Sequence, residues 1–251
     1  MKNSFKDKVA LVTGGASGIG RATALNFARK GTKVVIADWI ENQETIDIIE
    51  NLGGDGIFVK CDVSKASDVK ALIEKTVATY GRLDYAFNNA GIEGKSAPTQ
   101  DCSEENWDKT IGVNLKGIWL CMKYEIPEML KKGKGVIVNC SSVAGLVGFQ
   151  GSPAYVASKH GIIGLTKTAA LENAKLGIRV NVVCPGVIQT PMIDRLTGKK
   201  KETVEQFTDL EPVGRFGEPE EIANAVVWLC SDEASFVTGL AMPVDGGFVA
   251  Q

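Results

Sequence analysis

The chain has 251 residues, of which 44% are hydrophobic and 23% are charged, and its formal net charge is -2 at pH 7. Such values are ordinary for a globular protein, and the charge argues against a nucleic-acid-binding protein, which usually carries a basic patch. No segment approaches the ~20 apolar residues of a membrane span, and Met1–Lys8 lacks the apolar core of a signal peptide. The six cysteines are scattered without a C-x-x-C pair, so we expect reduced thiols, no metal site and a cytoplasmic protein.

The N-terminal segment predicts a strand, a glycine-rich turn and a helix in succession. An aliphatic run, Lys8–Thr13, meets Gly14, and a helical pattern of apolar residues begins at Ile19. In such a unit Gly14 permits a tight turn, Gly18 lets the backbone approach a pyrophosphate, and Gly20 lets helix and strand pack closely. The phosphates would lie at the positive helix N-terminus. The sequence therefore predicts a dinucleotide site whose turn residues are Gly14, Ser17, Gly18, Ile19 and Gly20.

The second predicted strand, Lys33–Ala37, ends at Asp38. A carboxylate at this place accepts hydrogen bonds from the ribose hydroxyls of an adenosine and repels a 2′-phosphate. No Arg or Lys lies between Gly14 and Gly20, and Trp39 follows the carboxylate, so nothing obvious would pair with such a phosphate. We therefore expect NAD(H) to be preferred over NADP(H).

Strand-like runs alternate with helix-length segments through the rest of the chain. Further strands are expected at Gly56–Lys60, Leu83–Phe87, Gly135–Asn139, Arg179–Val183 and Leu240–Val244, and helices at Ser67–Tyr80, Ser103–Lys131, Pro153–Lys175 and Pro219–Leu229. Repeated βα units predict a parallel sheet with helices on both faces. We expect one α/β domain over residues 1–251, a doubly wound Rossmann-type fold with a seven-stranded parallel sheet. Ligands of such sheets bind beyond the carboxyl ends of the strands.

A tyrosine and a lysine lie one helical turn apart in the third of these helices. Tyr155 and Lys159 share a helix face because they are four residues apart. A phenol is a poor base at neutral pH, but a neighbouring ammonium favours the phenolate and makes it a usable general acid or base. Ser142 follows a predicted strand, and its hydroxyl could hydrogen-bond the oxygen that exchanges a proton with Tyr155. Taken alone, such a pair is usually two ordinary helix residues; the dinucleotide pattern overturns that interpretation.

These motifs together resemble the classical short-chain dehydrogenase/reductase (SDR) family. The resemblance covers about Phe5 to Phe248 and rests on Thr13-Gly14-x-x-x-Gly18-Ile19-Gly20, Asn88-Asn89-Ala90-Gly91, Ser142, Tyr155-x-x-x-Lys159 and Pro185-Gly186. It implies an NAD-dependent oxidoreductase that interconverts a secondary alcohol and a ketone by hydride transfer. In the family the tyrosine gives a proton to the ketone oxygen or takes one from the alcohol. The lysine also hydrogen-bonds the nicotinamide ribose, and the serine holds the substrate oxygen.

The resemblance implies roles for further residues. Asn114 would hold a water that links Lys159 to solvent, although without the resemblance we would prefer a capping or surface asparagine. Residues expected near the adenosine are Asp62, Val63, Asn89, Ala90 and Gly91, and those expected near the nicotinamide are Pro185, Gly186, Ile188 and Thr190. Local turn preference supports a capping role for Asp62 about equally. Asn88 is expected to tie strands together.

The segment 190–217 interrupts the alternation of strands and helices. It is polar with scattered apolar residues, and we expect a substrate-binding lid with an amphipathic helix, with an inert surface excursion as the alternative. Most candidate pocket residues are apolar: Glu93, Val143, Ala144, Phe149, Gln150, Gly186, Val187 and Met192. No arginine is in obvious reach to bind a carboxylate or phosphate. A neutral, fairly hydrophobic or cyclic substrate is therefore expected.

Two other functions are weighed against the dehydrogenase. A 3-oxoacyl-carrier reductase of the same family is opposed by Asp38, because those enzymes mostly prefer NADPH. A non-catalytic NAD(H)-binding sensor is disfavoured because the serine, tyrosine and lysine are all present. His160, the only histidine, points away from the Tyr155–Lys159 face, which argues against a Ser-His-Asp hydrolase or a zinc dehydrogenase. The resemblance also implies a homotetramer that pairs the helices Ser103–Lys131 and Pro153–Lys175.

Overall fold

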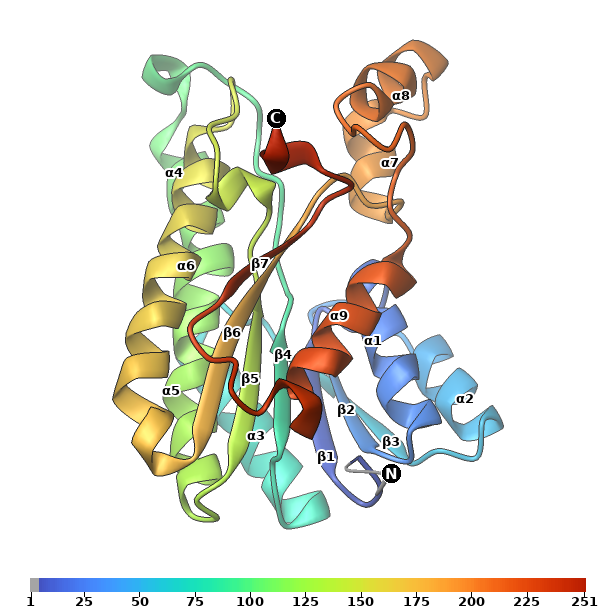
Figure 1. Cartoon of the computed structure of the whole chain (residues 1–251), viewed down its shortest axis with the longest axis vertical. Helices are drawn as coiled ribbons and strands as arrows, with labels where there is room; N and C mark the ends of the chain where they lie inside the picture. Colours follow the sequence, from blue (N-terminus) through green and yellow to red (C-terminus); the bar gives the residue numbers. More distant parts are fainter. Residues whose placement is uncertain (1–4) are drawn as a thin grey trace.

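The computed structural model describes residues 5–251; residues 1–4, part of the segment in which we expect no signal peptide, lie outside the described residues. The described chain forms one sheet of seven parallel strands in the order β3-β2-β1-β4-β5-β6-β7 (Figure 1). The strands are β1 Val9–Thr13, β2 Lys33–Asp38, β3 Gly56–Lys60, β4 Tyr85–Asn88, β5 Gly135–Cys140, β6 Ile178–Pro185 and β7 Ala241–Val244. The predicted fold class is confirmed. Successive strands are added on one side of β1 up to β3 and on its other side from β4 onward. Sheets of this kind bind ligands at the point between β1 and β4 where this change occurs.

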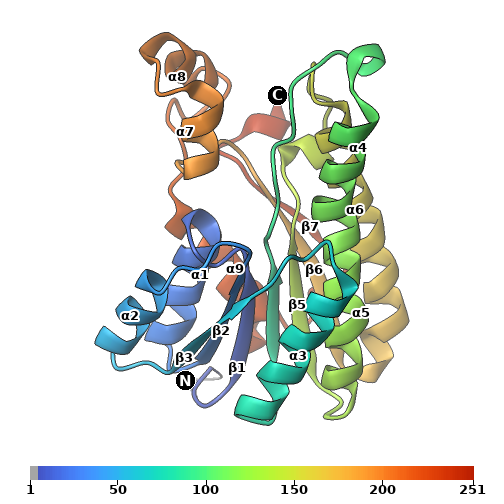
Figure 2. The ribbon, with the colours of Figure 1, turned by 180° about the vertical axis from the view of Figure 1, so that it is seen from behind.

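Helices cover both faces of the sheet (Figures 1 and 2). One face carries α1 Gly18–Arg29, α2 Glu44–Asn51 and α9 Pro219–Cys230; the other carries α3 Ala66–Tyr80, α4 Glu104–Ile111, α5 Gly117–Leu130 and α6 Pro153–Asn173. Alternate strand residues serve the two faces: Leu11 packs into the cluster beneath α3, α5 and α6, and Val12 packs beneath α1 and α9. Burial on both sides explains why the strands are continuous aliphatic runs.

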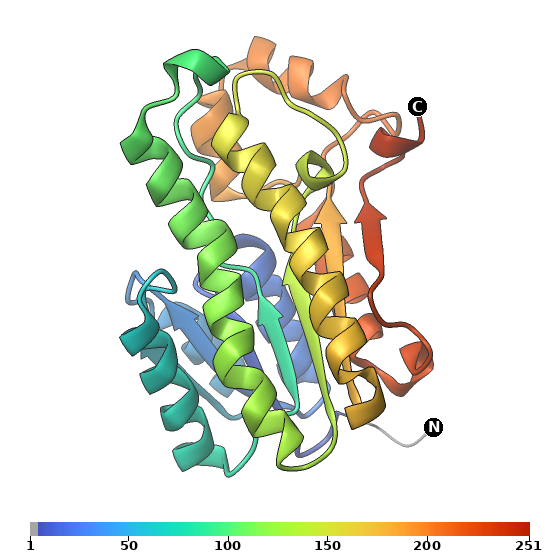
Figure 3. The same cartoon turned by 90° about the vertical axis from the view of Figure 1, so that its left-hand side faces the viewer.

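The segment predicted as one helix, Ser103–Lys131, contains a change of helical geometry. A π-helical turn, Gly112–Lys116, lies between α4 and α5, and the three parts form one continuous rod (Figure 3). Asn114 lies within this turn and is fully buried. Single π-helical turns inside α-helices often accompany functional sites. The predicted helix is confirmed, but its sequence gave no sign of the π turn.

The segment 190–217, which we expected to be a lid with one helix, contains two short helices. These helices, α7 Pro191–Thr197 and α8 Lys201–Thr208, lie at the carboxyl end of the sheet together with the C-terminus of the chain (Figure 1). Gly198, which follows α7, has a φ of +58°, a left-handed conformation that ends the helix. Among residues 5–251, no helix combines the length and the apolarity needed to cross a bilayer.

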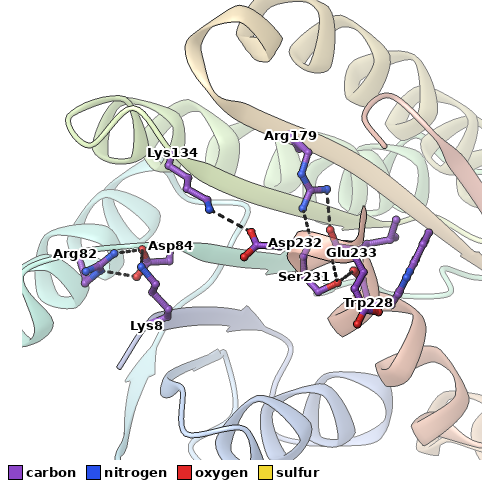
Figure 4. Close-up of polar contacts among 10 residues, drawn as sticks. Lys8, Arg82, Asp84, Lys134, Arg179, Trp228, Ser231, Asp232 and Glu233 are labelled. Atoms are coloured by element: carbon purple, nitrogen blue, oxygen red, sulfur yellow. Dashed lines mark hydrogen bonds and ion pairs between the residues drawn. The ribbon is translucent and has the colours of Figure 1, made fainter. Parts of the chain in front are cut away.

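The opposite end of the sheet is held by a polar network (Figure 4). Arg179, at the start of β6, donates hydrogen bonds to the carbonyl oxygens of Leu229, Ser231 and Val237 at 2.8, 3.0 and 3.1 Å. Two of these carbonyls lie at the C-terminal end of α9, where a cation is favourable. Lys134, just before β5, pairs with Asp232 at 3.2 Å. The network lies far from the carboxyl ends of the strands, so we assign it a structural role.

Candidate active site

The glycine-rich turn between β1 and α1 leaves no room for side chains. Gly14 and Gly18 have φ angles of +66° and +52°, a region that favours glycine. A Cβ on Gly14 would lie 2.8 Å from Nδ2 of Asn89, and one on Gly20 would overlap the carbonyl oxygen of Gly14. A Cβ on Gly18 would lie 3.1 Å from Cγ2 of Thr190, at the start of the lid. Glycine at these three positions therefore lets the turn pack closely against Asn89, the start of α1 and Thr190.

Polar groups around this turn suit a dinucleotide. Ser17, the N-cap of α1, is exposed and makes no side-chain cap hydrogen bond within the described chain, so the positive end of the helix stays available to an anion. The Asp38 carboxylate lies beside the turn and accepts hydrogen bonds from the backbone N–H groups of Ala16 and Ile40, both at 3.2 Å. A carboxylate thus lies next to the glycine-rich turn.

The motif after β4 fixes the turn in place. The backbone N–H groups of Asn89 and Ala90 donate to Oγ1 of Thr13 at 3.0 and 3.2 Å, and Asn89 Nδ2 donates to the carbonyl oxygens of Thr13 and Gly14 at 3.1 and 3.2 Å. Asn88 is buried and donates to Glu125 Oε2 at 3.0 Å and to Asn139 Oδ1 at 3.1 Å. It therefore ties β4 to α5 and β5, as expected. The anchoring roles of Thr13 and Asn89 were not anticipated.

The catalytic candidates on α6 and in the π turn meet beside this motif. Lys159 is only 4% exposed, and its Nζ lies 5.4 Å from the centre of the Tyr155 ring and donates to the Cys140 carbonyl oxygen at 3.0 Å. A Cβ on Gly91 would lie 3.7 Å from that Nζ and 3.3 Å from Oδ1 of Asn114. The Asn114 amide also bonds both the N–H and the C=O of Ile92, at 2.8 and 2.9 Å. Three distant segments converge here.

Ser142 lies next to α6 because its neighbour Ser141 is hydrogen-bonded to that helix. Ser141 Oγ donates to the backbone carbonyl oxygen of Lys159 at 2.8 Å and so pins the end of β5 to α6. Ser142 caps the short 3-10 helix Val143–Gly145 and accepts a hydrogen bond from the N–H of Ala144 at 3.2 Å. Both Ser142 and Tyr155 are half-buried. His160 is exposed, and its ring bonds the Val156 carbonyl oxygen at 3.0 Å within the helix.

Comparison with known proteins agrees with this geometry over the whole chain. The adh_short_C2 family model, described as enoyl-(acyl carrier protein) reductase, matches residues 14–249. Cyclohexanol dehydrogenase of Acinetobacter sp. (strain SE19) is 47% identical over 253 residues, which cover 100% of this chain and 98% of the relative. 2,5-Dichloro-2,5-cyclohexadiene-1,4-diol dehydrogenase of Sphingobium indicum is 44% identical over 249 residues and 99% of both chains. The chain belongs to the short-chain dehydrogenase/reductase family.

Two further comparisons support this assignment. 3-Oxoacyl-(acyl-carrier-protein) reductase FabG of Thermotoga maritima is 45% identical over 249 residues, which cover 98% of this chain and 99% of the relative. The crystal structure of levodione reductase superposes with a TM-score of 0.93 at 37% identity and covers 98% of this chain and 99% of that chain. The SDR described here is accordingly an enzyme that acts on alcohol or ketone groups.

Some predicted cofactor residues of this SDR have buried side chains. Val63 packs in the core, where a Cβ on Gly117 of α5 would approach it to 2.9 Å, and Ile188 packs beneath α9. Their main chains alone could therefore face a cofactor. Asp62 accepts hydrogen bonds from the N–H and Oγ of Ser64 at 3.0 and 2.6 Å. Burial opposes its ionisation, but these bonds and Lys65 outweigh it and lower the pKa of Asp62. The turn role weighed above for Asp62 is present in the structure.

The base of the lid is held by contacts that the sequence did not predict. Gln189 N donates to Gly217 O at 2.8 Å, and Gly217 N donates to Val187 O at 2.9 Å. Glu211, only 4% exposed, accepts a hydrogen bond from Val187 N at 2.5 Å and lines a cavity of about 170 Å³ with Gly186 and Val187. Burial raises the pKa of Glu211. These bonds join both ends of the lid directly after Pro185-Gly186.

Two contacts link the segments around the predicted substrate pocket. Phe149 stacks on Phe248 of the C-terminal segment, with ring centres 5.6 Å apart. Arg195 of α7 forms a bidentate ion pair with Glu93, with Nε–Oε1 and Nη2–Oε2 distances of 2.8 and 3.1 Å. Arg195 therefore lies beside Glu93, one of the candidate pocket residues, but its guanidinium is already occupied by that carboxylate. Sequence reasoning could not find this pair because its residues are 102 positions apart.

Proposed function

We propose that this SDR is an NAD-dependent dehydrogenase that interconverts a neutral, cyclic secondary alcohol and its ketone. The observation that carries the proposal is the buried Lys159 ammonium against the Tyr155 ring, at the sheet edge that also bears the glycine turn. Tyrosine and lysine in this relation form an acid–base group, and the turn is built for a dinucleotide. Together they suit hydride transfer coupled to the movement of one proton.

In the proposed mechanism Tyr155 takes the hydroxyl proton of an alcohol or returns it to a ketone oxygen. The Lys159 ammonium, 5.4 Å from the centre of the Tyr155 ring, would stabilise negative charge that develops on the phenol oxygen during this step. Ser142 donates a hydrogen bond to the substrate oxygen and stabilises charge that develops there. Asn114 fixes the Gly91–Ile92 segment beside Lys159, where protons can be exchanged with solvent through a bound water. A nicotinamide bound at this edge supplies or accepts the hydride.

The glycine turn would hold the cofactor phosphates. Gly14, Gly18 and Gly20 allow a tightly packed turn that a side chain at any of them would disturb, and the uncapped start of α1 provides favourable electrostatics for an anion. The adenosine would meet Asp38, Asp62, Asn89 and the main chain of Val63, Ala90 and Gly91. The nicotinamide side would meet Tyr155, Lys159, Pro185, Gly186, Thr190 and the main chain of Ile188.

The preference for NAD over NADP rests on charge around the turn. The Asp38 carboxylate would repel a 2′-phosphate. Arg21, an arginine that contacts the turn, is already engaged: it donates twice to the Ala16 carbonyl oxygen, at 3.0 and 2.7 Å, and pairs with Glu44 at 2.7 Å. A 2′-phosphate would therefore meet a carboxylate and no free cation from this arginine.

The substrate class rests on the pocket and on the relatives. Val143 and Ala144, which follow Ser142, are apolar but only 3% exposed each, so the stronger support is that two of the relatives are named for cyclic alcohols or diols. The alternative is a 3-oxoacyl-carrier reductase, favoured by the 45% identity to FabG. The proposed NAD preference opposes it.

We further propose a homotetramer in the cytoplasm. A mostly apolar groove lies between the α4–α5 rod and α6, which lie side by side (Figure 3); it is lined by Ile111, Leu115, Lys116, Trp119, Gly161 and Leu165. Trp119 is 44% exposed there, and an exposed apolar strip of this kind suits the same strip of a second copy. The six cysteines are free thiols, which suits a reducing compartment.

The test is a substrate panel followed by absorbance of the reduced cofactor. Cyclic and linear secondary alcohols would be offered with NAD and, separately, with NADP; a 3-oxoacyl thioester would be offered with NADH and NADPH. The proposal predicts that cyclic alcohols with NAD give the highest kcat/KM. A higher kcat/KM for the thioester with NADPH would support the reductase alternative and contradict the proposal.

A further inference from the structure

A charged pair joins the lid to the body of the protein beside the proposed reaction centre. Glu93 lies two residues after Gly91, which borders Lys159 Nζ, and two residues span at most about 7 Å of chain. Arg195 lies on α7, five residues after Thr190, whose side chain borders Gly18. Figure 2 shows α7 on one side of the carboxyl edge of the sheet and α4 with the segment leading to it on the other. The Glu93–Arg195 pair therefore connects α7 with the segment after β4 at the carboxyl edge of the sheet.

The two charges in this pair neutralise each other. The bidentate geometry, at 2.8 and 3.1 Å, lowers the pKa of Glu93 and raises that of Arg195, so both groups are ionised at neutral pH. Asp194, the neighbour of Arg195, is engaged elsewhere: it pairs with Lys199 at 3.2 Å. Glu93 is thus the carboxylate that occupies the guanidinium of Arg195.

We infer that the Glu93–Arg195 pair determines substrate charge specificity, so that neutral alcohols are accepted and carboxylates are rejected. An unpaired guanidinium matches a carboxylate in shape and charge and would bind one bidentately. Glu93 already fills that place, so a carboxylate substrate would meet an occupied cation and a like charge. A neutral substrate requires no partner there. The inference rests on the proposed function, because it concerns the substrates of the same site.

The pair could instead serve as a mechanical latch on the lid, and the two roles make different predictions. Loss of a latch changes lid closure and so affects neutral and anionic substrates in the same direction. Loss of charge neutralisation changes kcat/KM for the anionic substrate and leaves that for the neutral substrate nearly unchanged. Whether kcat/KM for the anionic substrate rises or falls then depends on which partner of the pair is removed. The ratio of kcat/KM for an anionic and a neutral substrate of equal shape therefore separates the roles.

The experiment compares a hydroxycyclohexane carboxylate with the matching carboxamide, both oxidised with NAD at low ionic strength. Glu93→Gln leaves Arg195 unpaired and should raise the carboxylate-to-carboxamide ratio of kcat/KM about tenfold, mainly through KM. Arg195→Gln leaves Glu93 unpaired and should lower the ratio. The double variant should return close to the parent ratio. The gain in Glu93→Gln should shrink in high salt, because the pair is partly exposed.

The control is Asp232→Asn, which removes another long-range ion pair at the far end of the sheet (Figure 4) and should leave the ratio unchanged. A parallel loss on both substrates in both single variants, with the ratio constant, would overturn the inference and leave the proposed function standing. If the parent oxidises neither compound nor any other alcohol with NAD, the proposed function fails and the inference fails with it.

Discussion

Nζ of Lys159 lies 5.4 Å from the centre of the Tyr155 ring and donates a hydrogen bond to the Cys140 carbonyl oxygen at 3.0 Å. The contact joins α6 to the end of β5 and sets the distance between a buried cation and a half-buried phenol. A neutral carbonyl partner orients the ammonium without cancelling its charge. The ammonium therefore keeps its positive charge beside the Tyr155 ring.

Asp38→Ala should weaken NADH binding and narrow the preference for NAD over NADP by about tenfold or more, because repulsion of the 2′-phosphate is lost. The ratio of kcat/KM for the two cofactors measures the effect. The matched control is Asp47→Ala, which removes an exposed carboxylate on α2 and should leave this ratio unchanged. An unchanged ratio in the Asp38 variant would mean that another group recognises the ribose.

Glu125→Gln should remove a pH dependence of stability. Burial raises the pKa of Glu125 to about 8 from an ordinary 4.5. The folded state then holds a proton that the unfolded state releases in this window, so the free energy of unfolding falls as pH rises from 4.5 to about 8. The slope is at most about 1.4 kcal/mol per pH unit, and chemical denaturation across this range would measure it. The variant should show a flatter curve.

Glu128→Gln is the control for this measurement. Its carboxylate lies on the same helix but pairs with Lys131 at 2.7 Å near the surface, and such pairs contribute little. A parent protein whose stability does not fall between these pH values would contradict the assignment of a buried, protonated Glu125.

Trp119→Glu should break the proposed assembly by placing a charge in the apolar groove. Light scattering or sedimentation should then report a smaller species than the parent at the same concentration. Leu52→Glu, at the end of α2 and 48% exposed, offers the same change on another face and should leave the assembly intact. A Trp119→Glu variant with the mass of the parent would contradict the proposed interface.

Arg179→Met should lower the melting temperature and leave kcat/KM close to that of the parent. It removes hydrogen bonds to three carbonyl oxygens at the end of α9 and in the following loop, and about 3 kcal/mol of stability is expected to be lost. Lys134→Met, which breaks an exposed pair with Asp232, should have almost no effect on melting. Equal melting of the two variants would contradict the structural role assigned to Arg179.

Much of the fold could be predicted because its signals are local. The consecutive apolar residues Val34, Val35 and Ile36 predict a strand covered on both faces, and all three are fully buried. The spacing of Gly14, Gly18 and Gly20 likewise predicts a turn. The tertiary contacts of the site carry no such local pattern. Nothing near Arg195 in sequence reveals Glu93. The burial of the Val63 and Ile188 side chains likewise depends on packing from distant helices, so sequence assigned them contacts that only their main chains could make.

Asn114 could be predicted in part: its helix has a local signal in the sequence, but its tertiary contacts do not. Its position within a helix was clear, but the π turn that places its amide against Ile92 was not. A helix pattern of apolar residues does not distinguish a regular turn from one with an extra residue. The resemblance to the family supplied what local pattern could not.

The central claim is that Tyr155 exchanges the substrate proton under the influence of Lys159. The most direct measurement is NADH formation by Tyr155→Phe from the cyclic alcohol that the parent oxidises fastest in the substrate panel, with NADH binding followed by fluorescence in the same preparation. The account predicts that turnover falls by at least about a thousandfold while NADH binding stays close to that of the parent. Turnover within tenfold of the parent, with the cofactor bound normally, would contradict it.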